Sequence, residues 1–119
     1  MPKYNQDFIL PANNGIDLRF EGITNESTGD LVPVGDILGA TWGMTPYEDE
    51  VSPLVEKSLS GGTIFIPEDG TVVVKLLATD TDGLSGEFTH ELRLLAADTV
   101  HTAARGKITI KYQVVSNPI

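Results

Sequence analysis

Apolar and polar residues alternate along several short stretches of this chain, and the clearest stretch is residues 86–94. One set of alternate positions there consists of Phe88, His90, Leu92 and Leu94. The other set is polar and consists of Glu87, Thr89, Glu91 and Arg93. Because successive side chains of a β-strand point to opposite faces of its sheet, this period of two predicts a half-buried strand.

The same alternation, interrupted by turn residues, recurs along most of the chain. We predict strands over residues 6–10, 16–23, 40–47, 54–60, 63–66, 71–78, 86–96 and 100–115. The first of these is expected to lie at a sheet edge. In residues 40–47, Ala40, Trp42 and Met44 share one side, so the single tryptophan is an expected core residue.

Glycine and proline mark the expected turns and irregularities. Residues 67–70, with the sequence Pro-Glu-Asp-Gly, predict a tight turn, because proline presets φ and glycine reaches positive φ. Gly106 predicts a bulge or bend within the last strand. Residues 24–34 form a polar excursion, which three apolar side chains are expected to attach to the core: Leu31, Val32 and Val34.

The number and spacing of these strands predict the fold class. No stretch predicts a helix of about ten or more residues. About seven to nine short strands separated by turns are typical of an antiparallel, immunoglobulin-like β-sandwich, with a small closed barrel as the alternative. The 119 residues suffice for one hydrophobic core and are too few for two. We therefore expect a single all-β domain over residues 1–119.

Charge and composition narrow the classes of function. The chain has 17 acidic and 8 basic residues, and its net charge of −9 disfavours binding to nucleic acid or to an anionic membrane. Solubility is the simplest explanation of this charge, and an acidic face that meets a basic partner is the sharper alternative. The absence of cysteine excludes disulfides and thiolate metal sites. Since neither a secretory signal nor a membrane-length apolar stretch occurs, we expect synthesis in a cytoplasm.

Few residues suggest catalytic or metal chemistry. Asp80-Thr81-Asp82-Gly83 has part of a calcium-loop pattern, but the next residues add no ligands. We therefore expect Asp80 to cap one helical turn within residues 79–85 or to form an Asx-turn. His90 and His101 can share a zinc ion only if folding brings them together. The alternation instead predicts a hydrogen-bonded core histidine at position 90. Without a nucleophile motif or a buried acid pair, we expect no cofactor and no enzymatic activity.

Surface contacts are the remaining route to function, since all-β domains of this kind commonly bind or assemble. The first candidate interface is an acidic loop and the aromatic residue beside it: Tyr47, Glu48, Asp49 and Glu50. The second is Arg105, in the stretch 103–105, and the third is the excursion over residues 25–30. An exposed edge strand would also accept the strand of a neighbour by β-augmentation.

A series of spaced motifs gives a further indication of function. They are Asp36-Ile37-Leu38-Gly39-Ala40-Thr41 before Trp42, Glu56-Lys57-Ser58 before Gly61-Gly62-Thr63-Ile64, Gly70-Thr71-Val72, Asp80-Thr81 followed by Leu84 and Gly86, His90-Glu91-Leu92, and Arg105-Gly106-Lys107-Ile108-Thr109-Ile110. In this order, the chain resembles small β-sandwich proteins of tailed bacteriophages. These are the immunoglobulin-like N-terminal domain of baseplate upper proteins and the sandwich proteins linked to long tail-fibre complexes.

The resemblance implies a non-enzymatic structural or assembly protein of the virion, associated with the tail, baseplate, tail fibre or neck. Its partners would be other virion proteins and copies of itself. Because no receptor-binding part follows Ile119, a stand-alone adaptor or decoration protein is favoured. The alternative is a carbohydrate-binding or host-adhesion module, which needs exposed aromatic platforms. The aromatic residues expected outside the core are Tyr4, Tyr47 and either Phe8 or Phe65. Tyr47, beside the acidic loop, is the expected platform.

Overall fold

A computed structural model describes residues 6–12, 15–24, 29–46, 54–96 and 99–111. Its strands are β1 (Phe8–Pro11), β2 (Ile16–Phe20), β3 (Ile37–Thr45), β4 (Val55–Ser58), β5 (Ile64–Glu68), β6 (Thr71–Leu76), β7 (Gly86–Ala96) and β8 (Thr99–Lys111). Two single turns of 3-10 helix, η1 (Val34–Asp36) and η2 (Ala78–Asp80), lie in the connections. Strand β7 has the predicted bounds, and η2 begins one residue before the predicted helical turn. No helix in these described ranges has the length and apolar character needed to cross a membrane.

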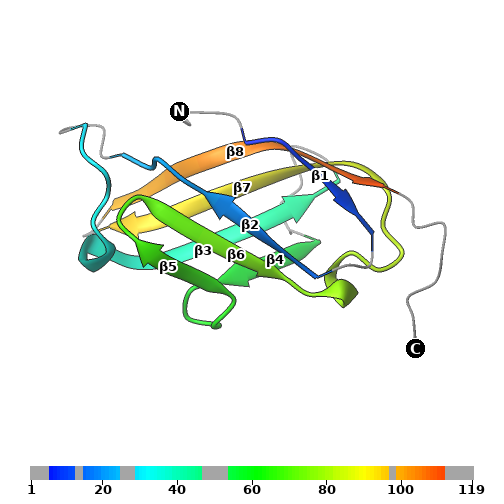
Figure 1. Ribbon diagram of the computed structural model, residues 1–119, viewed down its shortest axis with the longest axis horizontal. Coiled ribbons are helices and arrows are strands. Elements are labelled where there is room, and N and C mark those ends of the chain that lie inside the picture. The colour runs from blue at the N-terminus through cyan, green and yellow to red at the C-terminus, as the bar shows by residue number, and fades with distance from the viewer. Residues whose placement is uncertain (1–5, 13–14, 25–28, 47–53, 97–98, 112–119) are drawn as a thin grey trace.

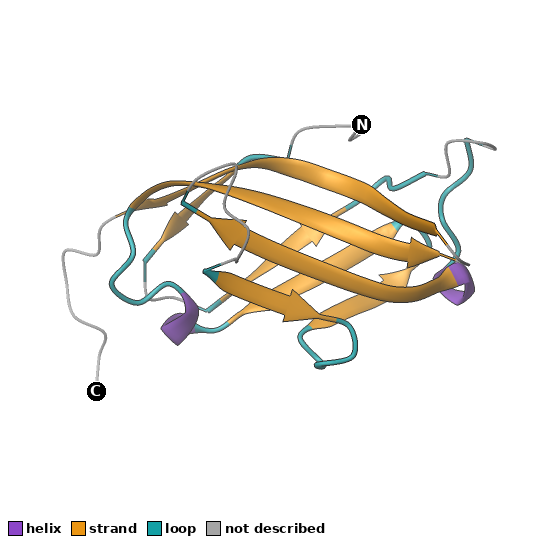
Figure 2. Cartoon of the chain, turned by 180° about the vertical axis from the view of Figure 1, so that it is seen from behind, coloured by secondary structure: helices purple, strands orange, loops and turns teal. Residues whose placement is uncertain are grey.

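The strands form two sheets packed face to face (Figures 1 and 2). One sheet has the order β1-β8-β7-β3-β4 and the other has the order β2-β6-β5. The paired strands are antiparallel except β1 and β8, which are parallel. In this immunoglobulin-like arrangement, β2, β6 and β5 take the places of strands B, E and D, while β3, β7 and β8 take those of C, F and G. The predicted sandwich is confirmed, and the closed barrel is wrong.

The core lies between the two sheets and is built from the inward set of alternate positions. Ala40, Trp42 and Met44 of β3 are buried, as the sequence predicts. The inward set of β7, Phe88, His90, Leu92 and Leu94, is also buried. Burial of these side chains against those of the smaller sheet contributes roughly 25 cal/mol per Å² of apolar surface. This packing is the main stabilising contribution to the sandwich.

Gly106 does not form the predicted bulge. The register between β7 and β8 shifts so that Ala103, not Gly106, is the extra residue. Gly106 instead lies where β1 approaches β8. A Cβ at this position would overlap the carbonyl of Gln6 and lie 2.7 Å from Oδ1 of Asp7. Glycine is therefore required here for the close approach of the first strand.

The excursion between β2 and β3 is attached differently from the prediction. Val32 packs against the core, but Leu31 and Val34 are 49 % and 39 % exposed, so their predicted role as core anchors is wrong. Backbone hydrogen bonds make the attachment: the Val32 N–H donates to the Ile23 carbonyl at 3.0 Å, and the Gly70 N–H donates to the Val32 carbonyl at 2.8 Å. Gly70 has the positive φ, 73°, expected for the turn after β5, and residues 67 and 68 still belong to that strand.

An ion pair joins the connection after β6 to the edge strand β4. Nζ of Lys57 lies 2.7 Å from Oδ2 of Asp80, and the two side chains are only 10 % and 18 % exposed. The same carboxylate oxygen accepts a hydrogen bond of 2.7 Å from the backbone N–H of Leu77. Asp80 therefore caps η2, as the sequence predicts. It also balances the positive charge of Lys57, which lies opposite Trp42 in the register of β3 and β4.

Replacing Gly106 by alanine tests the close approach of β1 to β8. We expect Gly106→Ala to lower the free energy of unfolding by about 1–3 kcal/mol, because the new methyl group displaces the start of β1. Gly35→Ala is the matched control, since a Cβ there meets open space, and it should change stability by less than about 0.5 kcal/mol. Urea unfolding followed by the fluorescence of Trp42 measures both. Equal stability of the two variants would contradict the predicted close approach.

Removing the Asp80 carboxylate tests the connection between η2 and β4. Asp80→Ala should lower the free energy of unfolding by about 2–3 kcal/mol, because it removes the cap and leaves a mostly buried lysine without its partner. Asp82, exposed in the same connection, provides the control: Asp82→Ala should cost less than about 0.5 kcal/mol. Urea unfolding measures the free energy of unfolding of both variants. An equal decrease in the two would rule out a specific role of Asp80.

Candidate functional site

The outer face of the five-stranded sheet presents regularly spaced side chains to solvent. Figure 2 shows this face toward the viewer, with the 3-10 turns at its two ends. Strand register arranges the outward side chains in rows that cross the sheet. One row contains Thr41, Arg93 and Thr102, and the next contains Glu91 and Arg105. We define this surface as the outer face.

Two arginines on the outer face share one glutamate. Nε of Arg105 is 3.5 Å from Oε2 of Glu91, and Nε of Arg93 is 3.7 Å from Oε1 of the same residue. About half of each arginine side chain is exposed, and these distances are long for charge-assisted hydrogen bonds. Exposed pairs of this kind contribute about 0.2–1 kcal/mol each. Both guanidinium groups are therefore accessible to an acidic group of another molecule.

The remaining cations of the outer face follow β8. Lys107 and Lys111 occupy the same set of alternate positions as Arg105, and β8 contains no acidic residue. Nζ of Lys107 lies 3.1 Å from Oγ1 of Thr89 on the neighbouring strand. A protein with a net charge of −9 thus has a local row of positive charge along one strand.

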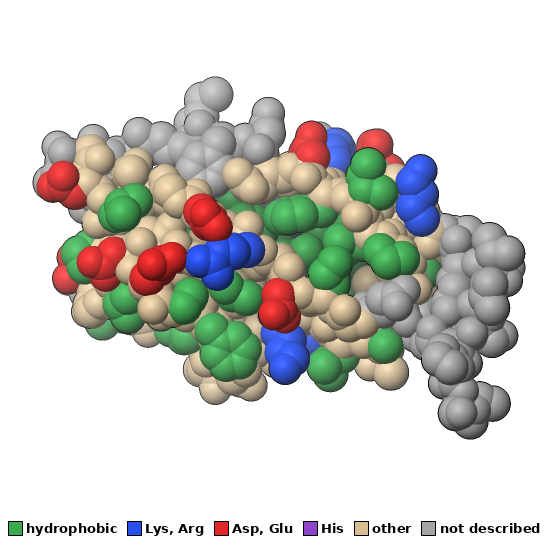
Figure 3. Space-filling view, viewed as in Figure 1, with side chains coloured by type: hydrophobic (Ala, Val, Ile, Leu, Met, Phe, Trp, Pro, Cys, Tyr) green, Lys and Arg blue, Asp and Glu red, His purple; other side chains and the backbone are tan. Residues whose placement is uncertain are grey.

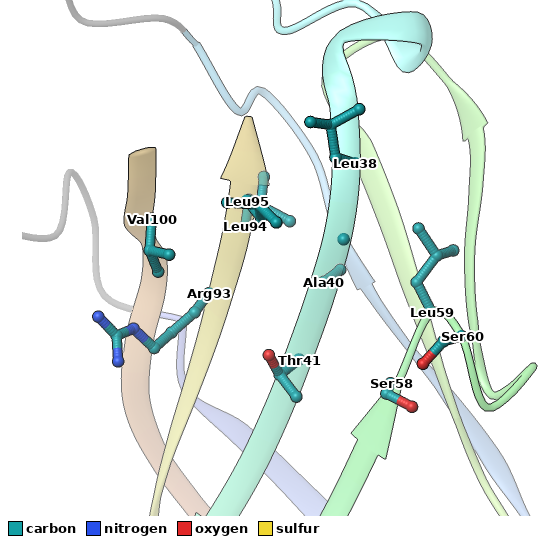
Figure 4. A pocket seen from close by; sticks show the side chains of 11 residues that line it. Leu38, Ala40, Thr41, Ser58, Leu59, Ser60, Arg93, Leu94, Leu95 and Val100 are labelled. Carbon is teal, nitrogen blue, oxygen red and sulfur yellow. The ribbon is translucent and has the colours of Figure 1, made fainter. Parts of the chain in front are cut away.

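An open hollow lies at the end of the outer face next to η1 (Figure 4). Its volume is about 450 Å³, and its lining residues are Leu38, Gly39, Ala40, Thr41, Ser58, Leu59, Ser60, Arg93, Leu94, Leu95 and Val100. Leu38 is 62 % exposed and Val100 is 50 % exposed, with the half-buried Leu95 on the strand between them. A Cβ at Gly39 would contact Leu95 at 3.6 Å, so the glycine leaves the hollow open. The site therefore combines exposed aliphatic groups with one guanidinium.

The predicted interface residues are only partly placed by the structure. Tyr47, Glu48, Asp49 and Glu50 lie outside the described residues, as do positions 25–28 of the excursion. In the second candidate stretch, residues 103–105, Ala103 and Ala104 are buried, and Arg105 alone is exposed. Arg105 stands on the outer face, within reach of Glu91 and one row away from the hollow.

The apolar residues of the hollow were not identified from the sequence. The adjacent leucines at positions 94 and 95 could have predicted an apolar residue on the outer face. A strand that buries Leu94 must turn Leu95 to the other face of its sheet. Leu38 gives no such signal. The register of β3 shifts between Ile37 and Gly39, which breaks the alternation on which parity arguments depend.

A buried polar cluster behind the outer face surrounds His90. The indole Nε1 of Trp42 donates a hydrogen bond of 3.0 Å to Nδ1 of His90, and the ring Nε2 donates to the carbonyl of Gln6. Phe8 and Phe20 lie with their ring centroids 5.5 and 5.8 Å from the imidazole. The arrangement requires a neutral ring with its proton on Nε2. The predicted hydrogen-bonded core histidine is confirmed.

Burial lowers the pKa of His90 below its ordinary value of 6.5. The hydrogen bond to the Gln6 carbonyl and the nearby charge of Asp7 raise the pKa, but they offset the effect of burial only in part. Protonation would also place an N–H group against the indole N–H of Trp42, where two donors would meet. The folded state therefore favours the neutral imidazole.

The two histidines do not form a zinc site. His101 is opposite Leu94, four residues along β7 from His90, which is a separation of roughly 13 Å at the rise of a strand. Both ring nitrogens of His90 are already hydrogen-bonded within the core. Across the described ranges, no group of three or more His, Cys, Asp or Glu side chains is arranged to hold a metal ion.

Comparison with known proteins gives no family assignment. No protein-family model matches the chain, and no curated protein matches it. Among solved structures, the crystal structure of CopC from Methylosinus trichosporium OB3b is similar, with 10 % sequence identity and a TM-score of 0.49. The similarity covers 96 % of this chain and 91 % of that chain. At this identity and TM-score, it supports no inference about function.

The pKa of His90 predicts a pH-dependent stability. Well above pH 6.5 the ring is neutral in the folded and unfolded chains, so its contribution to stability is complete. As the pH falls below 6.5, the unfolded chain takes up the proton first, and the free energy of unfolding decreases toward the lower folded pKa. Urea unfolding between pH 7.5 and about pH 5, above the range where carboxylates dominate, measures this decrease.

Two histidine variants separate this effect from general acid sensitivity. His90→Gln should flatten the pH dependence in this window, whereas His101→Gln, on an exposed position, should retain it. If His90→Gln leaves the pH dependence of the free energy of unfolding unchanged, the dependence does not come from His90.

Proposed function

We propose that this chain is a non-enzymatic structural domain that acts through protein–protein contacts, in the virion of a tailed bacteriophage. The outer face with its hollow is the observation that supports the contact function. The order of motifs along the sequence supports the assignment to a virion, at the tail, baseplate, tail fibre or neck. Other virion proteins and copies of the chain are the proposed partners.

The composition of the outer face favours a protein partner. Leu38 and Val100 place aliphatic groups in solvent around a hollow, which is typical of a surface that another molecule covers. Arginine is enriched in protein interfaces because its planar group both packs and donates several hydrogen bonds, and Arg93 lines this hollow. The strongly negative net charge makes nucleic acid an unfavourable partner.

The carbohydrate-binding alternative depends on an exposed aromatic side chain. Phe8 packs against Phe20 and His90, whereas Phe65 of β5 is exposed. Phe65 lies on the smaller sheet, away from the hollow. Binding in a glycan array that Phe65→Ala abolishes would favour this alternative over a protein-contact domain.

Incorporation into particles tests the proposed function. Phage particles assembled with the native chain should contain it after purification. Particles assembled with the double variant Arg93→Glu and Arg105→Glu, at a chain concentration well below saturation, should contain about tenfold less, because a loss of about 1.4 kcal/mol in the contact lowers the affinity by that factor. Quantitative mass spectrometry of the purified particles measures the amount of chain.

Lys75→Glu serves as the matched charge reversal, since Lys75 is exposed on the other sheet, and it should leave incorporation unchanged. Unfolding curves verify that all variants are folded. Absence of the native chain from particles would contradict the virion role. Equal incorporation of the two charge-reversal variants would exclude the outer face as the contact.

A further inference from the structure

We infer that the hollow on the outer face receives the η1 tip of a second copy of this chain, and that the two copies form a closed dimer. This inference rests on the proposed function, because it names the partner of the same surface. It follows from the match between two neighbouring regions of one molecule: a hollow with an aliphatic rim and one guanidinium group, and an apolar tip with carboxylates beside it.

The tip consists of exposed aliphatic side chains surrounded by carboxylates. Leu31 and Val34 are its apolar residues. The exposed acidic residues of this end are Glu21, Asp30, Asp36, Glu68 and Asp69. Glu21 and Glu68 are paired with Arg19 at 2.7 and 3.0 Å, so the negative charge beside the apolar residues comes from Asp30, Asp36 and Asp69. Figure 3 shows acidic side chains gathered at this end of the molecule, where η1 and the turn between β5 and β6 lie. We define Leu31, Val34 and Asp36 as the tip.

Hydrogen bonds hold the tip in one shape. Oδ1 of Asp69 accepts a hydrogen bond of 2.9 Å from the backbone N–H of Val34. The N–H of Asp36 donates to the Pro33 carbonyl at 3.1 Å. A preformed tip loses little conformational entropy when it binds, which favours its use as an interface.

The hollow has the complementary composition. Its rim is formed by Leu38, Leu95 and Val100, and its charged residue is Arg93. Arg105 lies one row further along the outer face and brings a second cation. An inserted Val34 side chain would cover the aliphatic rim, while Asp36 of the incoming tip would meet the accessible guanidinium of Arg93. Charge complementarity of this kind selects the partner and its orientation.

The position of the two regions selects a closed dimer. Leu38 follows Asp36 by two residues, so the tip and the hollow adjoin at the same end of the molecule. A two-fold axis beside this end lets each tip occupy the hollow of the other copy, so that the same residues make both contacts. Since every tip and every hollow is then used, assembly stops at two chains.

Light scattering after size exclusion tests the dimer at two protein concentrations. The native chain, with a mass of 12.8 kDa, should give twice that mass at the higher concentration. The measurement is made at 0.15 M salt, where a Debye length of about 8 Å screens the repulsion between two acidic molecules. Val34→Asp in the tip and Val100→Asp in the hollow should each weaken the dimer more than tenfold. Both positions are exposed, and thermal unfolding verifies that each variant is folded.

Phe65→Asp is the matched control, because it places the same charge on a similarly exposed apolar position outside the two regions, and it should leave the mass unchanged.

A charge exchange between the tip and the hollow tests the orientation of the two copies. Asp36→Arg and Arg93→Asp should each weaken the dimer, and the two changes combined in one chain should restore it, because tip and hollow again have opposite charges.

Two outcomes would overturn the inference. A native chain that remains monomeric at both concentrations excludes self-association, while the proposed virion role keeps its own test in purified particles. A dimer that survives both Val34→Asp and Val100→Asp uses a different surface. If the native chain forms the dimer but is absent from purified particles, the virion role is overturned and the dimer is retained.

Discussion

The hydrogen bond from Trp42 to His90 is the constraint on which the arrangement of the larger sheet depends. It joins β3 to β7 inside the core, and the other nitrogen of the same imidazole bonds Gln6 at the entry to β1. Three strands are therefore oriented by one ring, and Phe20 of the opposite sheet packs against it. In many immunoglobulin domains a disulfide beside a buried tryptophan joins the two sheets. This chain has no cysteine, and the contact of Phe20 with the hydrogen-bonded pair of Trp42 and His90 joins its two sheets instead.

The composition of the outer face is a consequence of this inward arrangement. Because His90, Leu92 and Leu94 point into the core, Glu91, Arg93 and Leu95 of the same strand must point outward. The ion pairs of Glu91 and the outward position of Leu95 in the rim of the hollow are thus two results of one register. A single-residue slip of β7 would exchange the buried and exposed sets, which explains why core and surface are specified together.

The tip and the hollow arise where regular alternation ends. The shift in β3 turns Leu38 outward, and backbone hydrogen bonds, not buried side chains, attach the excursion before η1. The excursion can therefore keep Leu31 and Val34 exposed without loss of its attachment. Exposed apolar groups beside accessible charges suit a surface that is covered in an assembly, which is the physical basis of both the proposed function and the proposed dimer.

The sequence by itself determined the approximate positions of the strands, the sandwich class, the core position of Trp42 and His90, and a local capping or turn role for Asp80. These features depend on side-chain periodicity and short-range hydrogen bonding, which are readable from neighbouring residues. Arg105 was also identified as a candidate contact residue, because it stands on a strand with outward polar positions. The hollow near Arg105 could be found only in the tertiary structure. Leu38, Arg93 and Val100 come from three strands, and their proximity depends on strand order and on a register shift that no local pattern encodes. The need for glycine at position 106 was likewise decided by the parallel approach of β1, a contact between residues about a hundred positions apart in the chain.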